Sequence, residues 1–109
     1  MILSTDIWVA ALIRRVELGG GFAAVLRKGD ARAGAVLVKV INRRNGEARI
    51  FAEATSGEGQ RIWMQPLVAE VETDLDAYLT RAARIDPDVW VVEIDDHQGH
   101  HYLTEPIET

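Results

Sequence analysis

The sequence of 109 residues predicts one α/β domain of the α+β type. We expect two principal helices packed on a mostly antiparallel or mixed sheet of about four to six strands. Three observations predict this fold. Two stretches carry apolar residues at helical spacing, an Asn-Gly pair joins two apolar runs, and a third apolar run follows a helix-breaking proline. Residues 1–109 are therefore expected to form a single domain, with residues 104–109 as a frayed tail.

The first quarter of the chain predicts a helix followed by a strand. Apolar residues recur every three or four positions over 7–18, and Thr5 or Asp6 is suited to cap the first turn. Glycines 19–21 end this helix, since glycine tolerates the left-handed backbone of a C-terminal cap. The short apolar run over 22–27 then predicts a strand.

A hairpin over 35–53 is expected near the centre of the sheet. The run 35–41 is β-branched and nearly continuous, as in a strand covered on both faces. Asn45-Gly46 favours positive φ at a tight turn, so the chain should return as a strand over 47–53. Residues 61–65 predict a third antiparallel strand, which Pro66 should end.

The second helix is expected over 73–85, with Thr73 as its N-cap. Its apolar face consists of Leu75, Tyr78, Leu79, Ala82 and Ile85. Asp86-Pro87 should stop the helix and deliver the chain to a buried strand over 89–94, because a residue before proline avoids the helical region. Residues 100–103 predict one more short strand. The pattern leaves open the direction of the 89–94 strand and whether the helices share one face of the sheet.

Composition and motifs exclude several classes of protein. The absence of cysteine removes disulfides, thiol nucleophiles and thiolate metal sites. No stretch has about 18 uninterrupted apolar residues, and the N-terminus lacks a leader pattern, so we expect a cytoplasmic protein that does not contact the membrane. Glycines 19–21 follow a helix rather than a strand, which argues against a nucleotide loop. No Gly-x-Ser-x-Gly motif supports a serine hydrolase, and no cofactor is implied.

The charges divide unequally along the chain. Residues 1–51 carry nine Lys and Arg against four Asp and Glu, a balance of +5, whereas residues 52–109 carry three against thirteen, a balance of −10. Arg43 and Arg44 are the candidate anion-binding pair, because guanidinium groups bind phosphate well. The net charge of −5 argues against a nucleic-acid-binding protein.

One segment gathers groups that bind metals. Asp95, His97, His100 and His101 lie within seven residues and could hold a divalent ion if the turn brought them together. His100 and His101 would point to opposite faces of a strand, so an exposed polar hairpin is the simpler interpretation. Trp8, Trp63 and Trp90 are candidate core or interface anchors.

With these residues in view, the chain resembles a family of uncharacterised bacterial proteins found mainly in alphaproteobacteria, the domain of unknown function DUF1491. The resemblance is carried by residues 5–11 (TDIWVAA), 22–25 (FAAV) with 28–30 (KGD) and 33–34 (AG), and 86–93 (DPDVWVVE). It implies a compact α/β domain and a bacterial cytoplasm. It implies no activity and transfers no catalytic residue.

The leading functional hypothesis is a non-enzymatic interaction or scaffold module that binds itself or an unknown protein partner, with a homodimer formed through a tryptophan-bearing or edge-strand surface. One alternative is a small metal-dependent hydrolase that uses the 95–101 segment. A second alternative is phosphate or nucleic-acid binding by the basic N-terminal half.

Overall fold

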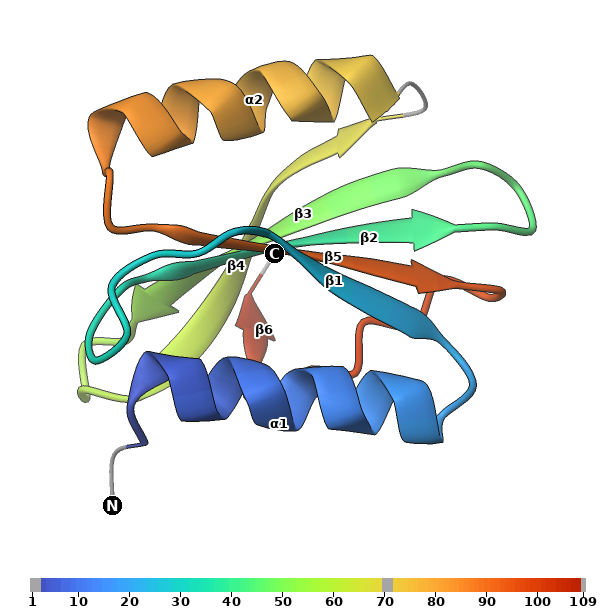
Figure 1. The fold of residues 1–109 in the computed structure, drawn as a ribbon. Helices are drawn as coiled ribbons and strands as arrows, with labels where there is room; N and C mark the ends of the chain where they lie inside the picture. Colours follow the sequence, from blue (N-terminus) through green and yellow to red (C-terminus); the bar gives the residue numbers. More distant parts are fainter. Residues whose placement is uncertain (1–2, 70–71, 109) are drawn as a thin grey trace.

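The computed structural model describes residues 3–69 and 72–108 of the chain. Within them it contains two helices and one sheet of six strands (Figure 1). In chain order the elements are α1 (Thr5–Leu18), β1 (Phe22–Arg27), β2 (Val36–Asn42), β3 (Ala48–Thr55), β4 (Arg61–Ala69), α2 (Glu72–Ile85), β5 (Trp90–Asp96) and β6 (Ile107–Glu108). This is the predicted α+β fold.

The sheet is mixed, and its strand order is β1-β5-β2-β3-β4-β6. β5 inserts between β1 and β2, running antiparallel to β1 and parallel to β2. β2, β3 and β4 form an antiparallel meander, and β6 pairs parallel with β4. The sequence left open whether β5 pairs parallel or antiparallel, and the structure shows one pairing of each kind.

The two helices lie on opposite faces of the sheet, with α2 above and α1 below it in Figure 1. Alternate residues of β2 and β5 consequently enter two separate cores. The core beneath α1 includes Val36, Val38, Val40, Trp90, Val92 and Ile94, whereas the core beneath α2 includes Leu37, Val91, Leu75 and Leu79. Coverage on both faces explains why the sequences of β2 and β5 are almost continuously apolar.

α1 begins two residues earlier than predicted. Ser4 is its N-cap residue, and neither Thr5 nor Asp6 takes that position. The hydroxyl of buried Thr5 instead donates to the carbonyl of Gly34 at 2.9 Å, which ties the helix to the loop before β2. The helix ends as predicted, with Gly20 at φ 91°.

The predicted hairpin joins β2 to β3, and its tight turn contains Asn45 and Gly46 as expected. Asn42 N–H donates to Glu47 at 2.8 Å and closes four intervening residues. Gly46 has φ 76°, whereas Asn45 keeps a negative φ. Only the glycine therefore needs the left-handed conformation, and the Asn45 side chain caps the turn by accepting from Glu47 N–H at 2.9 Å.

β4 does not end at Pro66 and continues to Ala69. Its pairing with β3 shifts register between Ile50 and Ala52, opposite the stretch that contains Pro66. A bulge leaves a backbone position outside the ladder, which accommodates a residue that has no N–H. The prediction that proline stops the strand was wrong for this reason.

α2 begins at Glu72, so Thr73 lies inside the helix rather than at its cap. Leu75 and Leu79 are buried as predicted, but Ile85 is 85% exposed and does not belong to the apolar face. After the helix, Asp86 accepts a hydrogen bond from Asp88 N–H at 3.0 Å, and the turn leads into β5. The predicted helix stop and buried strand are confirmed.

The C-terminal segment differs from both expectations placed on it. Residues 100–103 form no strand, whereas Ile107–Glu108 pair with Trp63 and Met64 as β6. Trp63 N–H also donates to the Pro106 carbonyl at 2.9 Å. Residues 107–108, which the sequence placed in a frayed tail, thus pair as an edge strand of the sheet.

Candidate functional site

The parallel strands β2 and β5 end side by side, with Asn42 opposite Asp96 in the ladder. The carboxyl ends of parallel strands are a common position for binding sites, because the chain leaves the sheet there as loops. In this protein the β2–β3 turn and the 97–102 segment leave the sheet at this point. The polar side chains of both segments therefore meet at this end of the sheet.

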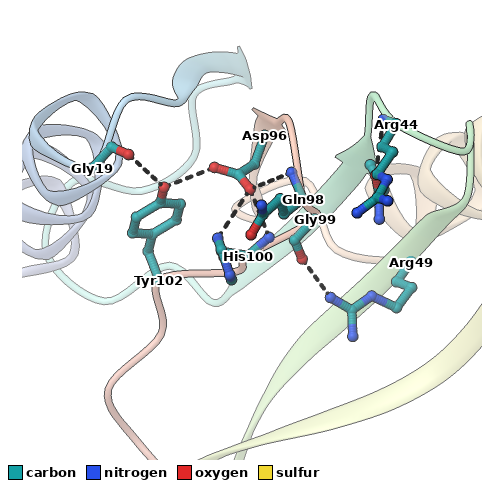
Figure 2. Close-up of polar contacts among 9 residues, drawn as sticks. Gly19, Arg44, Arg49, Asp96, Gln98, Gly99, His100 and Tyr102 are labelled. Carbon is teal, nitrogen blue, oxygen red and sulfur yellow. Dashed lines mark hydrogen bonds and ion pairs between the residues drawn. The ribbon is translucent and has the colours of Figure 1, made fainter.

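Buried Asp96 is the hub of the hydrogen bonds at this end of the sheet (Figure 2). One carboxylate oxygen accepts from the Tyr102 hydroxyl at 2.7 Å. The other accepts from the backbone N–H groups of Gln98 at 2.9 Å and His100 at 3.0 Å, and Nδ1 of His100 lies 3.2 Å from it. All of the contacts of Asp96 hold the turn in place, so the carboxylate is a structural acceptor.

These contacts shift two pKa values in opposite directions. Burial alone would raise the pKa of Asp96, but the bonds from His100, Tyr102 and Gln98 outweigh it, and the pKa lies below its ordinary value of 3.8. The hydrogen bond to Asp96 raises the pKa of Tyr102 above 10.0. Asp96 therefore stays ionised and Tyr102 stays protonated at neutral pH.

The backbone beyond Asp96 is constrained. Tyr102 has φ 60°, the left-handed conformation, and is the only non-glycine residue of positive φ within the described ranges. A Cβ placed on Gly19 would lie 2.4 Å from the Tyr102 ring, so the end of α1 fits tightly against this side chain. Gly99 has φ 75° and packs on Asn42. A strained residue fixed by a buried carboxylate marks a segment held in one shape.

The structure does not bring the four candidate metal ligands together. Asp95 is bonded to Arg43, whose Nε lies 2.6 Å from the carboxylate, and His97 is exposed. His100 turns to Asp96, while His101 lies against Phe51 with ring centroids 5.2 Å apart. Over residues 3–69 and 72–108, no three His, Asp or Glu side chains form a group that could hold a metal ion.

The side chain of His101 lies on the side of the segment that faces the core. Its Nδ1 accepts a hydrogen bond from Leu103 N–H at 2.9 Å, and burial, with help from Arg49 and His100, lowers its pKa below 6.5. His100 and His101 therefore have different partners, although the predicted strand over 100–103 does not form.

A surface pocket of about 540 Å³ opens beside the hub. It is lined by Asn42, Arg44, Asn45, Gln98 and His100, from the β2–β3 turn and the turn after β5. Of the two predicted anion-binding residues, Arg44 lines this pocket, whereas Arg43 forms an ion pair with Asp95.

The three tryptophans are buried. Trp8 and Trp63 both donate their indole N–H groups to Glu105, each at 3.0 Å, and Trp90 donates to the Asp30 carbonyl at 2.7 Å. Burial would raise the pKa of Glu105, but the bonds from Trp63 and Trp8 hold it below 4.5. These side chains are part of the hydrophobic core and do not form an exposed patch.

Large exposed apolar side chains gather instead at the edge strand β1. Phe22 is 65% exposed, Leu26 52% and Val25 41%, and Leu18 projects nearby from the end of α1. A groove of about 310 Å³ lies between β1 and α2 and is lined by Leu26, Arg27, Asp76, Leu79, Thr80, Ala83 and Val91. The outer edge of β1 therefore has features of a docking surface.

Sequence reasoning missed Asp96 and Tyr102. The alternation of Trp90, Val92 and Ile94 on one face of β5 extends to Asp96, so an acid in register with core residues was the available signal. Tyr102 gave none, because its role depends on a bend in the loop. Lys39 was also missed: it lies buried beneath α2 with its Nζ 2.8 Å from Asp76.

Fold and site together define a small three-layer α+β domain. At one end of its sheet, polar loops surround a buried aspartate. In the described part of the chain no helix is long and apolar enough to cross a membrane. The chain belongs to the family of proteins of unknown function DUF1491, whose family model matches residues 3–104.

Solved structures of similar proteins share this fold. A DUF1491 family protein from Caulobacter crescentus CB15, in a crystal structure, is 71% identical, with 98% of this chain and 100% of that chain covered and a TM-score of 0.94. An NMR structure of a DUF1491 family protein from the same organism, also 71% identical, covers 100% and 99% with a TM-score of 0.92. Protein Atu0922 from A. tumefaciens is 34% identical, covers 100% and 98%, and has a TM-score of 0.81. No curated protein matches the chain.

Proposed function

We propose that the protein is a non-enzymatic interaction module of the cytoplasm that forms a two-fold symmetric homodimer through β1. The observation that carries this proposal is the outer edge of β1. No strand from residues 3–69 or 72–108 pairs with this edge, and it exposes Phe22, Val25 and Leu26. An apolar edge strand is a template for pairing with another chain, and proteins usually protect such edges. A second copy would protect this one.

The faces of β1 determine which register a dimer can use. Phe22 and Ala24 pair with Asp95 and Glu93 of β5, so their side chains lie on the α2 face. Leu26 falls at the register shift between Val25 and Arg27, and it lines the groove under α2. Phe22, Ala24 and Leu26 therefore share one face.

An antiparallel pairing centred on Ala24 matches like faces. Ala24 meets its own copy at the two-fold axis, Phe22 lies opposite Leu26 of the second copy, and on the other face Ala23 lies opposite Val25. Each exposed side chain of one β1 thus faces an apolar side chain of the other. A two-fold interface needs this kind of self-complementarity.

The groove between β1 and α2 gives Phe22 a place to bind. In this register Phe22 of one copy lies above Leu26 of the other, next to Leu79, Ala83 and Val91. Burying an aromatic side chain covers about 150 to 250 Å² and dominates the energy of many interfaces. The contact occurs twice by symmetry and joins the two sheets into one.

The hydrogen bonds around Asp96 favour a binding role for this end of the sheet over a catalytic one. Its carboxylate already accepts from Tyr102 and from two backbone N–H groups, and it lies against His100. A general base needs a free acceptor within reach of a substrate proton. Asp96 offers none, because its contacts hold the turn.

The test is the mass of the protein in solution across a concentration series, measured by light scattering after gel filtration. The proposal predicts a mass of twice 12.1 kDa that shifts to 12.1 kDa for Phe22→Asp. Ile7→Asp is the matched control, since Ile7 is 54% exposed but lies on α1, and it should remain dimeric. A wild-type protein that stays at 12.1 kDa up to about 1 mM, a concentration at which even weak association appears, would overturn the proposal. A Phe22→Asp dimer would overturn the assignment to β1.

A further inference from the structure

The pocket beside Asp96 has the composition of an anion site. Its lining contains Asn42, Arg44, Asn45, Gln98 and His100, and none of the lining residues in the described part of the chain is acidic. It lies between two turns at the carboxyl ends of β2 and β5. We infer that this pocket binds a single phosphate group carried by a small molecule.

The charges around the pocket leave one arginine available. Arg43 is neutralised by Asp95, which its Nε contacts at 2.6 Å. Arg44 lies in the exposed turn, and among residues 3–69 and 72–108 its guanidinium group has no hydrogen bond or ion pair. The nearest acid of the hub, Asp96, is buried and bonded to the turn. An incoming anion therefore meets an uncompensated guanidinium group, which can contact two phosphate oxygens at once.

The two asparagines present donors to the same space. The side-chain oxygen of Asn42 accepts from Arg44 N–H and that of Asn45 accepts from Glu47 N–H, each at 2.9 Å. Since the turn uses both oxygens, the amide NH₂ groups are the polar ends left for a ligand. Gln98 adds another amide donor. Anion oxygens are acceptors, so donors from both turns fit them.

The opposite wall of the pocket is held in shape before any ligand arrives. Asp96 fixes the backbone N–H groups of Gln98 and His100, and Arg49 donates to the Gly99 carbonyl at 2.7 Å. A Cβ added to Gly99 would lie 2.9 Å from the Asn42 amide nitrogen, so the two turns pack closely. A preorganised wall reduces the entropy lost on binding.

The arrangement favours a small phosphorylated molecule over nucleic acid. Nucleic-acid affinity depends on several basic side chains that neutralise successive phosphates. Arg15, Arg27 and Arg49 each donate to a backbone carbonyl within the protein, those of Tyr102, Pro87 and Gly99. These arginines support the fold and do not form a continuous basic stripe.

The experiment is a titration of the full chain with inorganic phosphate, followed by the backbone and side-chain amide resonances in NMR spectra at constant ionic strength. Saturable shifts are expected at Asn45, Gln98 and His100. Arg44→Ala should weaken binding by at least tenfold, in line with loss of a charge-assisted contact. Arg14→Ala, an exposed arginine on α1, is the matched control and should bind within twofold of wild type.

Three results would overturn the inference. Chloride at equal ionic strength could produce the same shifts, which would identify general screening. Arg44→Ala could bind phosphate as tightly as wild type while retaining the wild-type spectrum elsewhere. A single-stranded DNA oligonucleotide could bind more tightly than phosphate with equal sensitivity to Arg14→Ala and Arg44→Ala, which would indicate a diffuse basic surface. Dimerisation through β1 is measured separately, so either proposal can fail without the other.

Discussion

The indole rings of Trp8 and Trp63 lie with their centroids 5.4 Å apart and donate to different oxygens of the same carboxylate, that of Glu105. Trp8 belongs to α1, Trp63 to β4, and Glu105 to the segment before β6. One charged side chain therefore connects the N-terminal helix, strand β4 and the C-terminal segment. Arg61 completes the cluster with its guanidinium carbon 5.1 Å from the centre of the Trp8 ring.

Glu105→Gln should lower the free energy of unfolding by about 1 to 3 kcal/mol, because glutamine has one oxygen acceptor and leaves one buried indole N–H without its charged partner. Urea unfolding followed by tryptophan fluorescence measures this loss. Glu58→Gln, in an exposed loop, is the control and should change the stability little. Equal losses in the two variants would contradict a specific role for Glu105.

Asp96 should make the protein sensitive to acid. Its pKa in the folded protein lies below the ordinary 3.8, so its contribution to stability is present above about that pH and is lost as the pH falls through the folded value. Asp96→Asn should therefore be less stable than wild type at pH 7, and the difference should shrink below pH 3.8. Thermal unfolding at a series of pH values gives the comparison. A difference that is constant with pH would show that the Asp96 charge does not matter.

Glu53 should have the opposite dependence. Burial raises its pKa above 4.5, with Glu105 adding to the shift, although Arg61 and Val36 N–H oppose it. Its favourable contribution is present below about 4.5 and is lost as the pH rises through the folded value. The stability of Glu53→Gln relative to wild type should therefore improve between pH 4.5 and pH 7. A relative stability that falls over this range would contradict the raised pKa.

Gly99→Ala should destabilise the turn that forms the pocket wall. Gly99 has φ 75°, and its added Cβ would meet Asn42 at 2.9 Å, so both backbone strain and a steric clash oppose the substitution. We expect a loss of about 1 to 3 kcal/mol, measured by chemical unfolding. Gly57→Ala is a matched control, because no atom lies within 4 Å of its added Cβ. Similar effects at the two sites would show that the turn is not tightly packed.

The central strands were predictable from the sequence because helices cover both of their faces. Such burial requires apolar side chains at successive positions, and β2 and β5 have that pattern. The helices were predictable from spacing and from Pro87. Pro66 misled the prediction because a bulge accommodates it. Ile85 continues the helical spacing of the apolar face, but it is the last residue of α2 and its side chain is exposed.

The candidate site was predictable only as a segment. Composition identified the stretch 95–101, but the choice between Asp95 and Asp96 depends on which face of β5 each occupies. The partners of Asp96 and Glu105 depend on contacts distant in sequence, and Trp8 and Glu105 are separated by 97 positions. β6 has two residues and no periodicity to detect. Local patterns carry no information about such pairs.

The place of β5 in the sheet affects how the protein folds while it is being made. β5 is synthesised after β1, β2, β3 and β4, yet it is the strand that joins β1 to the β2–β3–β4 meander. A nascent chain that lacks residues 90–96 consequently lacks the strand with which β1 pairs and which lies beside β2. Insertion of this late strand completes both cores at once, so the ribosome must release most of the chain before a native core can form.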